Sequence, residues 1–209
     1  MDQLSLTLVT DRTQTAGRDL VTIVSECLAV GLPAVQVREK DLSAKDLAVL
    51  CRQLRNLTRD TGALLIVNDR VDVALAVGAD AVQRTSTSID VKDMRDIAGR
   101  NLRIGASVHS LEEAVDAEAQ GADWVVYGPV YDTPSKRAYG APQGLERLAT
   151  VVRGVKIPVV AIGGITPARV GEVRAAGACG VGVISGILAA HSPADETRRY
   201  LKELASSTS

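Results

Sequence analysis

The sequence predicts a (β/α)8 barrel, a TIM barrel with all-parallel strands, that forms a single domain over residues 1–209. Eight short runs rich in β-branched residues alternate with longer stretches in which apolar residues recur every three to four positions. A doubly wound open sheet is the competing architecture, but residues 10–13, after the first strand, lack its phosphate-binding glycine motif. With 209 residues, the chain is shorter than the roughly 250 residues typical of the barrel, so its loops must be tight.

The predicted strands and helices alternate from one end of the chain to the other. The strands are expected at residues 4–9, 34–37, 64–67, 81–83, 103–106, 124–127, 159–162 and 180–184. The clearest helical patterns cover residues 43–59, 110–120, 145–153 and 167–176.

The ends of these helices are marked by capping residues. Ser43 and Ser110 are suitable N-caps, and Glu113 follows Ser110 at the spacing of a capping box. Thr166 likewise precedes a proline in the first turn of its helix. An alanine, one further residue and a glycine end four helical stretches, at Gly31, Gly78, Gly121 and Gly177. Glycine there permits the left-handed backbone that ends a helix and turns the chain back to the sheet.

Composition restricts the class of function. The chain has 24 basic and 25 acidic residues, a net charge of −1 and only 2% aromatic residues, which argues against a nucleic-acid partner. It lacks both a long uncharged apolar run and the pattern of a secretory leader, so we expect a cytoplasmic protein with no membrane partner. The three cysteines suit buried thiols better than disulfides. We therefore expect chemistry on a small molecule.

Polar residues gather where the predicted strands end, which is the active-site end of a parallel barrel. They are Gln36, Arg38, Lys40, Asn68, Asp69, Ser107, His109, Thr133, Ser135 and Lys136. Arg38 and Lys40 alternate along an extended backbone with Gln36 on the same side, and two cations beside an amide suit an anion such as phosphate. The alternative is that the two cations pair with Glu39, Asp69 or Asp11 and merely close the end of the barrel.

Two glycine-containing turns late in the chain favour phosphate binding. Gly163 and Gly164 follow the seventh strand, and Ile184, Ser185 and Gly186 follow the eighth. Glycine lets backbone N–H groups approach an anion, and barrels commonly bind phosphate at this position. Two adjacent turns of this kind are less well explained as simple tight turns.

Residues 128–144 form the longest stretch without periodicity, and they are rich in glycine, proline and hydroxyl groups. We expect a lid-like loop after the sixth strand that covers the mouth and delivers Thr133, Ser135 and Lys136 to phosphate oxygens. A solvated loop is the alternative. His109, beside the Ser110 cap, is the candidate general acid and base, unless its ring only holds the loop.

Six motifs in order carry a resemblance to a known family, at residues 36–40, 67–70, 105–110, 128–136, 161–165 and 183–187. Over almost the whole chain they resemble the thiamine-phosphate synthase and thiazole tautomerase (TenI-like) superfamily. The resemblance implies a thiamine biosynthesis enzyme that acts on a phosphorylated thiazole, with a homodimer as a further expectation.

The synthase of this superfamily joins hydroxymethylpyrimidine pyrophosphate to thiazole phosphate and releases pyrophosphate, with Mg²⁺ held by two aspartates. The resemblance assigns pyrophosphate binding to Gln36, Arg38, Lys40, Asn68, Ser107 and Lys136. Asp69 matches the first metal ligand, but Ser88 stands where the second carboxylate is expected. A neutral hydroxyl weakens such a site unless Asp90 replaces the missing acid.

The tautomerase branch shifts a proton in a thiazole carboxylate phosphate and needs no metal. Gln83, Ser88 and residues 107–114 are more similar to that branch, and His109 matches its proton-transferring histidine. We therefore expect a tautomerase without a cofactor, in which the glycine turns hold the phosphate and Arg38 and Lys40 favour the carboxylate or enol-like charge. Synthase activity with Mg²⁺ is the alternative, and a phosphate-ligand sensor without turnover is the second.

Overall fold

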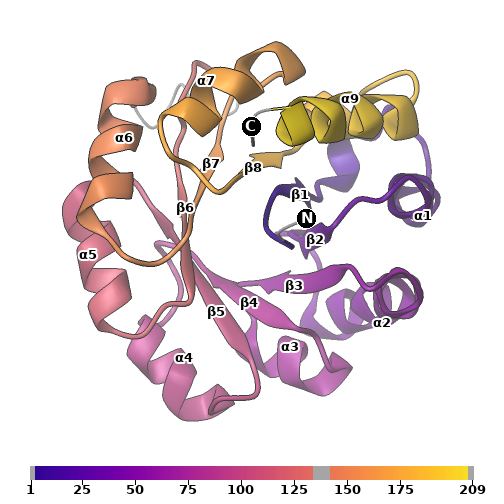
Figure 1. The fold of residues 1–209 in the computed structure, drawn as a ribbon. Coiled ribbons are helices and arrows are strands. Elements are labelled where there is room, and N and C mark those ends of the chain that lie inside the picture. Colours follow the sequence, from indigo (N-terminus) through magenta and orange to yellow (C-terminus); the bar gives the residue numbers. More distant parts are fainter. Residues whose placement is uncertain (1–2, 134–141, 207–209) are drawn as a thin grey trace.

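The computed structural model describes residues 3–133 and 142–206, which contain a closed barrel of eight parallel strands in sequential order (Figure 1). This arrangement confirms the predicted TIM barrel. The strands are β1 (Leu6–Val9), β2 (Ala34–Val37), β3 (Leu64–Asn68), β4 (Ala81–Arg84), β5 (Arg103–Val108), β6 (Trp124–Tyr127), β7 (Val159–Ile162) and β8 (Gly180–Val183). β1 pairs with β8, with Leu8 opposite Val183, and thereby closes the barrel.

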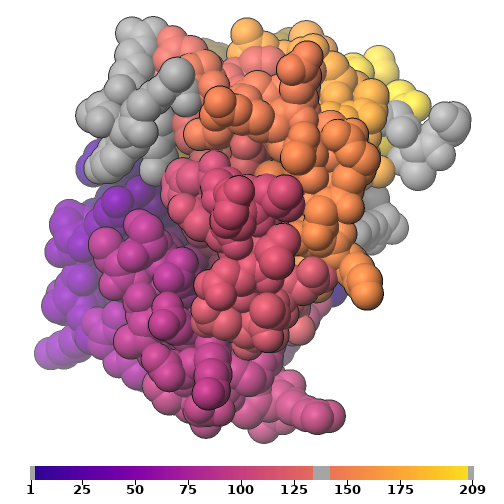
Figure 2. All heavy atoms as spheres, turned by 90° about the vertical axis from the view of Figure 1, so that its left-hand side faces the viewer, coloured from indigo at the N-terminus to yellow at the C-terminus, as the bar shows by residue number. Residues whose placement is uncertain are grey.

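Helices surround the strands (Figure 1). They are α1 (Leu20–Ala29), α2 (Ala44–Thr61), α3 (Val71–Val77), α4 (Val91–Ala98), α5 (Leu111–Ala119), α6 (Gly144–Gly154), α7 (Val170–Ala175), α8 (Ser185–Leu188) and α9 (Pro193–Ser206). Two short 3₁₀ segments, η1 (Arg12–Gln14) and η3 (Pro167–Arg169), follow β1 and β7. In Figure 2, α4, α5 and α6 cover one flank of the barrel. Among the described residues, no helix has the length and apolar character needed to span a bilayer.

Local sequence signals locate most elements to within two residues. β2, β6 and β7 have the predicted bounds, whereas β5 continues two residues further, to Val108, because that residue still pairs with Tyr127 of β6. The four glycines that end helical patterns all have positive φ, as predicted. The helix predicted from residue 167 begins instead as the 3₁₀ segment η3, and Thr166 caps it without a side-chain hydrogen bond.

The capping box at α5 is only half formed. Ser110 Oγ accepts a hydrogen bond from the Glu113 backbone N–H at 3.2 Å, as predicted. The Glu113 carboxylate, however, accepts from the backbone N–H of His109 at 2.7 Å rather than from Ser110. The acidic side chain therefore restrains the residue before the cap, which is the candidate acid and base.

An apolar cluster closes the amino-terminal end of the barrel. It is formed by the first residues of several strands and their neighbours, namely Leu4, Ala34, Leu64, Ile66, Ala81, Trp124 and Val160. Trp124 is 2% exposed and fills the interior, where Gly105 makes room for its indole ring. A larger apolar core lies between the strands and the helices. With this end filled by apolar side chains, the polar residues at the opposite ends of the strands can surround an open mouth.

We predict that Gly105→Ala lowers the free energy of unfolding by about 1–3 kcal/mol, because a side chain inserted into a packed interior forces its neighbours to move. A Cβ atom at this position would lie 2.3 Å from Trp124 Cε2 and 2.2 Å from Gln83 Oε1. Urea denaturation measures the change.

Gly171→Ala is the matched control, since Gly171 lies in α7 and a Cβ atom there meets nothing within 4 Å. Its free energy of unfolding should stay the same or rise by up to about 1 kcal/mol, because alanine favours helix. Equal unfolding midpoints for both variants would contradict the packing described for Trp124.

Candidate anion-binding site

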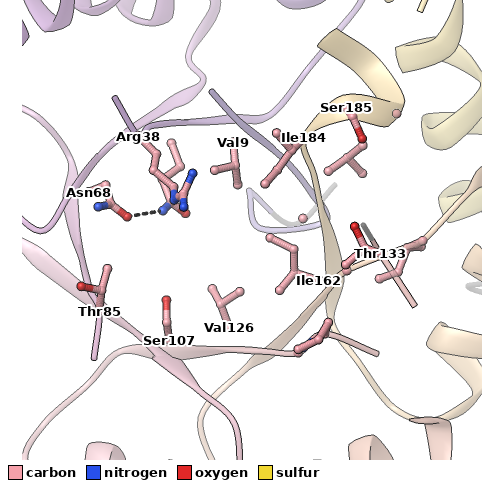
Figure 3. Close-up of a pocket in the computed structure, with 18 of the residues that line it drawn as sticks. Val9, Arg38, Asn68, Thr85, Ser107, Val126, Thr133, Ile162, Ile184 and Ser185 are labelled. Atoms are coloured by element: carbon pink, nitrogen blue, oxygen red, sulfur yellow. Dashed lines mark hydrogen bonds between the residues drawn. The ribbon is translucent and has the colours of Figure 1, made fainter. Parts of the chain in front are cut away.

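A cavity of about 970 Å³ opens at the carboxyl ends of the strands. Its lining includes every described residue that the sequence nominates for the site: Gln36, Arg38, Lys40, Asn68, Asp69, Ser107, His109, Thr133, Gly163, Gly164, Ile184, Ser185 and Gly186. Ser135 and Lys136 lie outside the described residues. Figure 3 shows Arg38 and Asn68 on one side of the cavity and Ile184, Ser185 and Thr133 on the other.

The loop after β2 presents two cations, Arg38 and Lys40, that form no ion pair with an acid among the described residues. Glu39, between them in sequence, is buried and accepts hydrogen bonds from Thr10 Oγ1 at 2.6 Å and from Arg12 Nη1 at 3.2 Å. No acidic group of residues 3–133 or 142–206 forms an ion pair with Arg38 or Lys40. Glu39 therefore pairs with Arg12. This pairing leaves the guanidinium of Arg38 and the ammonium of Lys40 available to bind another anion.

Asp11, a further candidate partner for these cations, also bonds elsewhere. Its pKa is lowered, because hydrogen bonds from Thr13 and Gln14 and the charge of Arg38 outweigh the opposing effect of partial burial. Thr13 Oγ1 and Gln14 Nε2 both donate to its carboxylate. Asp11 thus feels the charge of Arg38 while its oxygens are occupied by other donors.

Two polar side-chain pairs tie neighbouring strands together near the mouth of the barrel. Gln36 Nε2 donates to Asn68 Oδ1 at 3.0 Å, which ties β2 to β3. Gln83 Nε2 donates to Ser107 Oγ at 3.0 Å, which ties β4 to β5. With its oxygen occupied by Gln36, the Asn68 amide keeps its N–H groups available for an anion.

Asp69 occupies a constrained turn directly after β3. Its φ is 68°, in the left-handed region that a non-glycine residue rarely adopts, and Arg70 N–H donates to Asn68 O at 2.8 Å across it. Its own N–H donates to Gln83 O at 2.8 Å. Strained backbone of this kind costs roughly 1–3 kcal/mol and is often found at functional sites. The turn directs the Asp69 carboxylate to the edge of the cavity.

The donor set around Asp69 provides one carboxylate for a divalent cation. Ser88 Oγ donates a short hydrogen bond to Asp69 Oδ1 and accepts from Thr85 N–H at 2.9 Å. Asp90 does not replace the missing acid, because its exposed carboxylate lies 3.4 Å from Arg84 Nη2. No group of three His, Cys, Asp or Glu side chains suited to a metal occurs within the described ranges. Mg²⁺ is commonly held by one or two carboxylates and substrate phosphates, so Asp69 fits the one-carboxylate case.

His109 lines the cavity with its side chain 43% exposed. Its Nδ1 lies 3.4 Å from Glu113 Oε2, and the same oxygen accepts the backbone N–H of His109. The carboxylate therefore restrains both the loop and the ring. Proton transfer and loop support, the two roles considered from sequence, are both compatible with this arrangement.

The two glycine turns form the wall opposite the cations. Gly163 and Gly164 have φ values of 101° and 64°, and the space for a Cβ atom is filled by Pro129 at one residue and by Tyr131 at the other. Their N–H groups, and those of Ser185 and Gly186, donate to no acceptor in the described part of the chain. Since α8 has only four residues, its dipole is small, and an anion placed here would be attracted mainly by these N–H groups.

The loop after β6 is joined to the first glycine turn. Val130 N–H donates to Ile162 O at 2.9 Å and Tyr131 N–H to Gly163 O at 3.0 Å. Of the predicted lid at residues 128–144, the segment 134–141 lies outside the described residues. The described part places Thr133 at the cavity and ties the base of the loop to the turn after β7.

Several lining residues were not nominated from sequence. They are Gln14, Arg70, Thr85, Thr87, Asp132, Arg169, Glu196 and Tyr200 among others. Thr85 follows β4 directly, so the rule used for the other strand ends would have found it. Tyr200 comes from α9, far along the chain, and no local pattern connects it with the mouth.

Comparison with known proteins gives a consistent result. The family model described as thiamine monophosphate synthase matches residues 6–187. A Geobacter sulfurreducens protein named provisionally as a thiamine-phosphate synthase is 48% identical over 94% of this chain and 92% of its own length. The thiamine-phosphate synthase of Moorella thermoacetica is 42% identical over 95% of both chains.

A solved structure is also similar. The thiamine phosphate pyrophosphorylase of Pyrococcus furiosus has 39% identity and a TM-score of 0.92, covering 100% of this chain and 98% of the other. This chain therefore shares its fold with that protein over nearly the full length of both chains.

We predict that Arg38→Met raises the Kd for inorganic pyrophosphate by about tenfold, because it removes an unpaired cation from the cavity wall. Arg70→Met is the control: Arg70 also lines the cavity, but its guanidinium is already paired with Asp72. That variant should change the Kd by less than about threefold. Isothermal titration calorimetry measures both, and equal losses would contradict the distinction between paired and unpaired cations.

Proposed function

The chain belongs to the thiamine monophosphate synthase family, which acts in thiamine biosynthesis, and from this membership we propose that it is a thiamine-phosphate synthase. In this reaction hydroxymethylpyrimidine pyrophosphate and thiazole phosphate are joined and pyrophosphate is released. The named relatives favour this coupling reaction over the proton shift that Gln83, Ser88 and His109 favour in the sequence.

The observation that carries the proposal is that one cavity has two separate walls whose groups suit anions. Among the described residues, Arg38 and Lys40 after β2 form no ion pair, and backbone N–H groups of the turns after β7 and β8 have no acceptor. Coupling requires two phosphorylated substrates to be held at once, one with a diphosphate and one with a monophosphate. A tautomerase needs to hold only one phosphate. A cavity of about 970 Å³ has room for two such molecules.

The two walls suit the different anions. A diphosphate carries more charge and leaves during the reaction, so the cations Arg38 and Lys40 and the amide of Asn68 are placed to stabilise it as charge develops. The monophosphate does not react, and the fixed N–H groups of Gly163, Gly164, Ser185 and Gly186 are suited to holding it in one position. Binding at both ends would place the thiazole nitrogen against the pyrimidine's exocyclic carbon, and such orientation lowers the barrier. Apolar Val126 and Ile162 lie between the two walls (Figure 3).

Mg²⁺, if bound, would be held at Asp69 and would offset negative charge on the diphosphate. Ser88 orients that carboxylate by donating to Oδ1, and the Asp69 turn is fixed by its N–H bond to Gln83 O. Among the described residues, Asp69 would thus supply one carboxylate ligand and leave the remaining positions to water and substrate oxygens.

The direct test is coupling of the two phosphorylated precursors by the purified protein, with Mg²⁺ and with excess EDTA. We expect thiamine phosphate and pyrophosphate to form in equal amounts with Mg²⁺ and the rate to fall by about tenfold or more with EDTA, as expected when a cation stabilises a leaving group. Ser88→Asp, which adds a carboxylate beside Asp69, should lower the Mg²⁺ concentration needed for half-maximal rate. Absence of coupling at any Mg²⁺ concentration would contradict the proposed function.

Thiazole tautomerase activity remains the second candidate, favoured by the position of His109 at the cavity and by Ser88 in place of a second carboxylate. His109→Asn separates the two candidates. For a synthase, kcat for coupling should change by less than about threefold, because the ring is not needed as a proton carrier. For a tautomerase, kcat for isomerisation of the thiazole carboxylate phosphate should fall by about 10²–10⁴-fold. Binding of thiazole phosphate without either reaction would indicate a sensor.

A further inference from the structure

Two side chains hold the first glycine turn from behind. Arg169 Nη1, from η3, donates to the carbonyl oxygen of Gly164 at 2.6 Å. Tyr200 Oη, from α9, donates to the carbonyl oxygen of the next residue, Ile165, at 2.8 Å. Successive carbonyl groups of the turn are therefore each fixed by a side chain from a different helical segment.

These bonds also determine where the N–H groups of the turn point. In a trans peptide, the N–H group points opposite to the carbonyl of the same peptide plane. The carbonyl of Gly164 shares its plane with Ile165 N–H, and that of Ile165 shares its plane with Thr166 N–H. Both residues line the cavity, and within residues 3–133 and 142–206 neither N–H group has an acceptor. Fixing the two carbonyls thus directs two further unpartnered donors away from Arg169 and Tyr200.

The two holding side chains are themselves restrained. The Arg169 guanidinium lies 4.3 Å from the centroid of the Tyr131 ring, a cation–π contact. Tyr131 in turn packs on Gly164, where a Cβ atom would come within 2.8 Å of Tyr131 Cβ. Arg169 is therefore fixed from two sides and is not a mobile surface cation.

Tyr200 connects the two glycine turns. Tyr200 is 1% exposed, and its hydroxyl would lie 2.7 Å from a Cβ atom placed on Gly186, in the second turn. The pKa of Tyr200 is raised, mainly by burial and also by the charge of Glu196, so the hydroxyl stays protonated and donates at neutral pH. One ring thus contacts the turn after β7 through a hydrogen bond and the turn after β8 through close packing.

We propose that Arg169 and Tyr200 are positioning residues for the monophosphate subsite, which they shape by fixing the Gly164 and Ile165 carbonyls. The inference rests on the proposed function, in which the monophosphate of thiazole phosphate binds at the glycine turns. Neither side chain takes part in bond making or breaking. Their loss should therefore weaken binding of one substrate and leave the other substrate and the chemical step little changed.

Tyr200→Phe tests the hydroxyl alone. We expect the KM and Kd for thiazole phosphate to rise by about five- to twentyfold, because the Ile165 peptide loses its restraint. The KM for hydroxymethylpyrimidine pyrophosphate, and kcat at saturation, should change by less than about twofold. Tyr127→Phe is the matched control, since it removes a hydroxyl from another buried ring whose bond to Gln143 Oε1 is long, at 3.5 Å. It should leave all these constants unchanged.

Arg169→Met provides the second, independent variant. Arg174→Met is its control, because Arg174 also donates from Nη1 to a backbone carbonyl, that of Ala178, but at the amino-terminal side of β8. Arg169→Met should raise the Kd for thiazole phosphate, whereas Arg174→Met should not. Arg169→Lys, which keeps a donor, should recover part of the affinity that Arg169→Met loses. The salt dependence of that Kd should be the same in wild type and Arg169→Met. A weaker salt dependence in the variant would overturn the proposal by making Arg169 a direct phosphate ligand.

The same measurements distinguish failure of this inference from failure of the proposed function. Wild-type protein that binds thiazole phosphate but does not couple it would contradict the synthase proposal alone. Equal KM and Kd values for Tyr200→Phe and Tyr127→Phe, in an enzyme that couples normally, would overturn the positioning proposal alone. A wild-type protein that does not bind thiazole phosphate would overturn both.

Discussion

Closure of eight parallel strands brings the carboxyl ends of all of them to one mouth, and every feature of the candidate site depends on that constraint. β2 and β8 are separated by most of the chain, yet the residues after each line the same cavity because β1 pairs with both strands. The apolar cluster around Trp124 fills the opposite end of the barrel, whereas the cavity opens at the carboxyl ends of the strands. Gly105 is also needed to fill that end of the barrel, because the absence of a side chain there leaves room for Trp124.

The proposed function uses two physically different attractions for anions in this cavity. On the β2 side, the attraction comes from the positive charges of Arg38 and Lys40. These charges are available because Glu39, which lies between them in sequence, pairs with Arg12 instead. On the β7 and β8 side, the donors are backbone N–H groups whose direction is fixed by the fold, with Arg169 and Tyr200 holding the carbonyls behind them. Charged side chains suit a diphosphate that must bind and leave. Fixed backbone donors suit a monophosphate that only has to be held in place.

Features that depend on neighbouring residues could be predicted from the sequence. The strands, the glycines that end helices and the convergence of Arg38, Asn68 and Gly163 on one mouth follow from periodicity and topology. The pairing of Glu39 with Arg12, 27 residues away, and the bond from Tyr200 to the backbone of Ile165, 35 residues away, could not be predicted, because no local pattern specifies which groups from distant parts of the sequence meet. The half-formed capping box shows the same limit at short range: the spacing of Ser110 and Glu113 predicts both bonds, but local geometry gives the second to His109. Single residues such as Ser88 favour the proton shift in the sequence. Similarity over the whole chain, by contrast, is to proteins named for the coupling reaction.

A crystal structure of the protein with thiamine phosphate and pyrophosphate tests the division of the cavity most directly. We expect the monophosphate to lie within hydrogen-bond distance of backbone N–H groups of the two glycine turns, those of Gly163, Gly164, Ile165 and Thr166 after β7 and those of Ser185 and Gly186 after β8. We expect pyrophosphate to lie beside Arg38 and Asn68, with Asp69 toward any bound Mg²⁺. A structure with the two anions exchanged, or with the glycine turns facing only water, would contradict it.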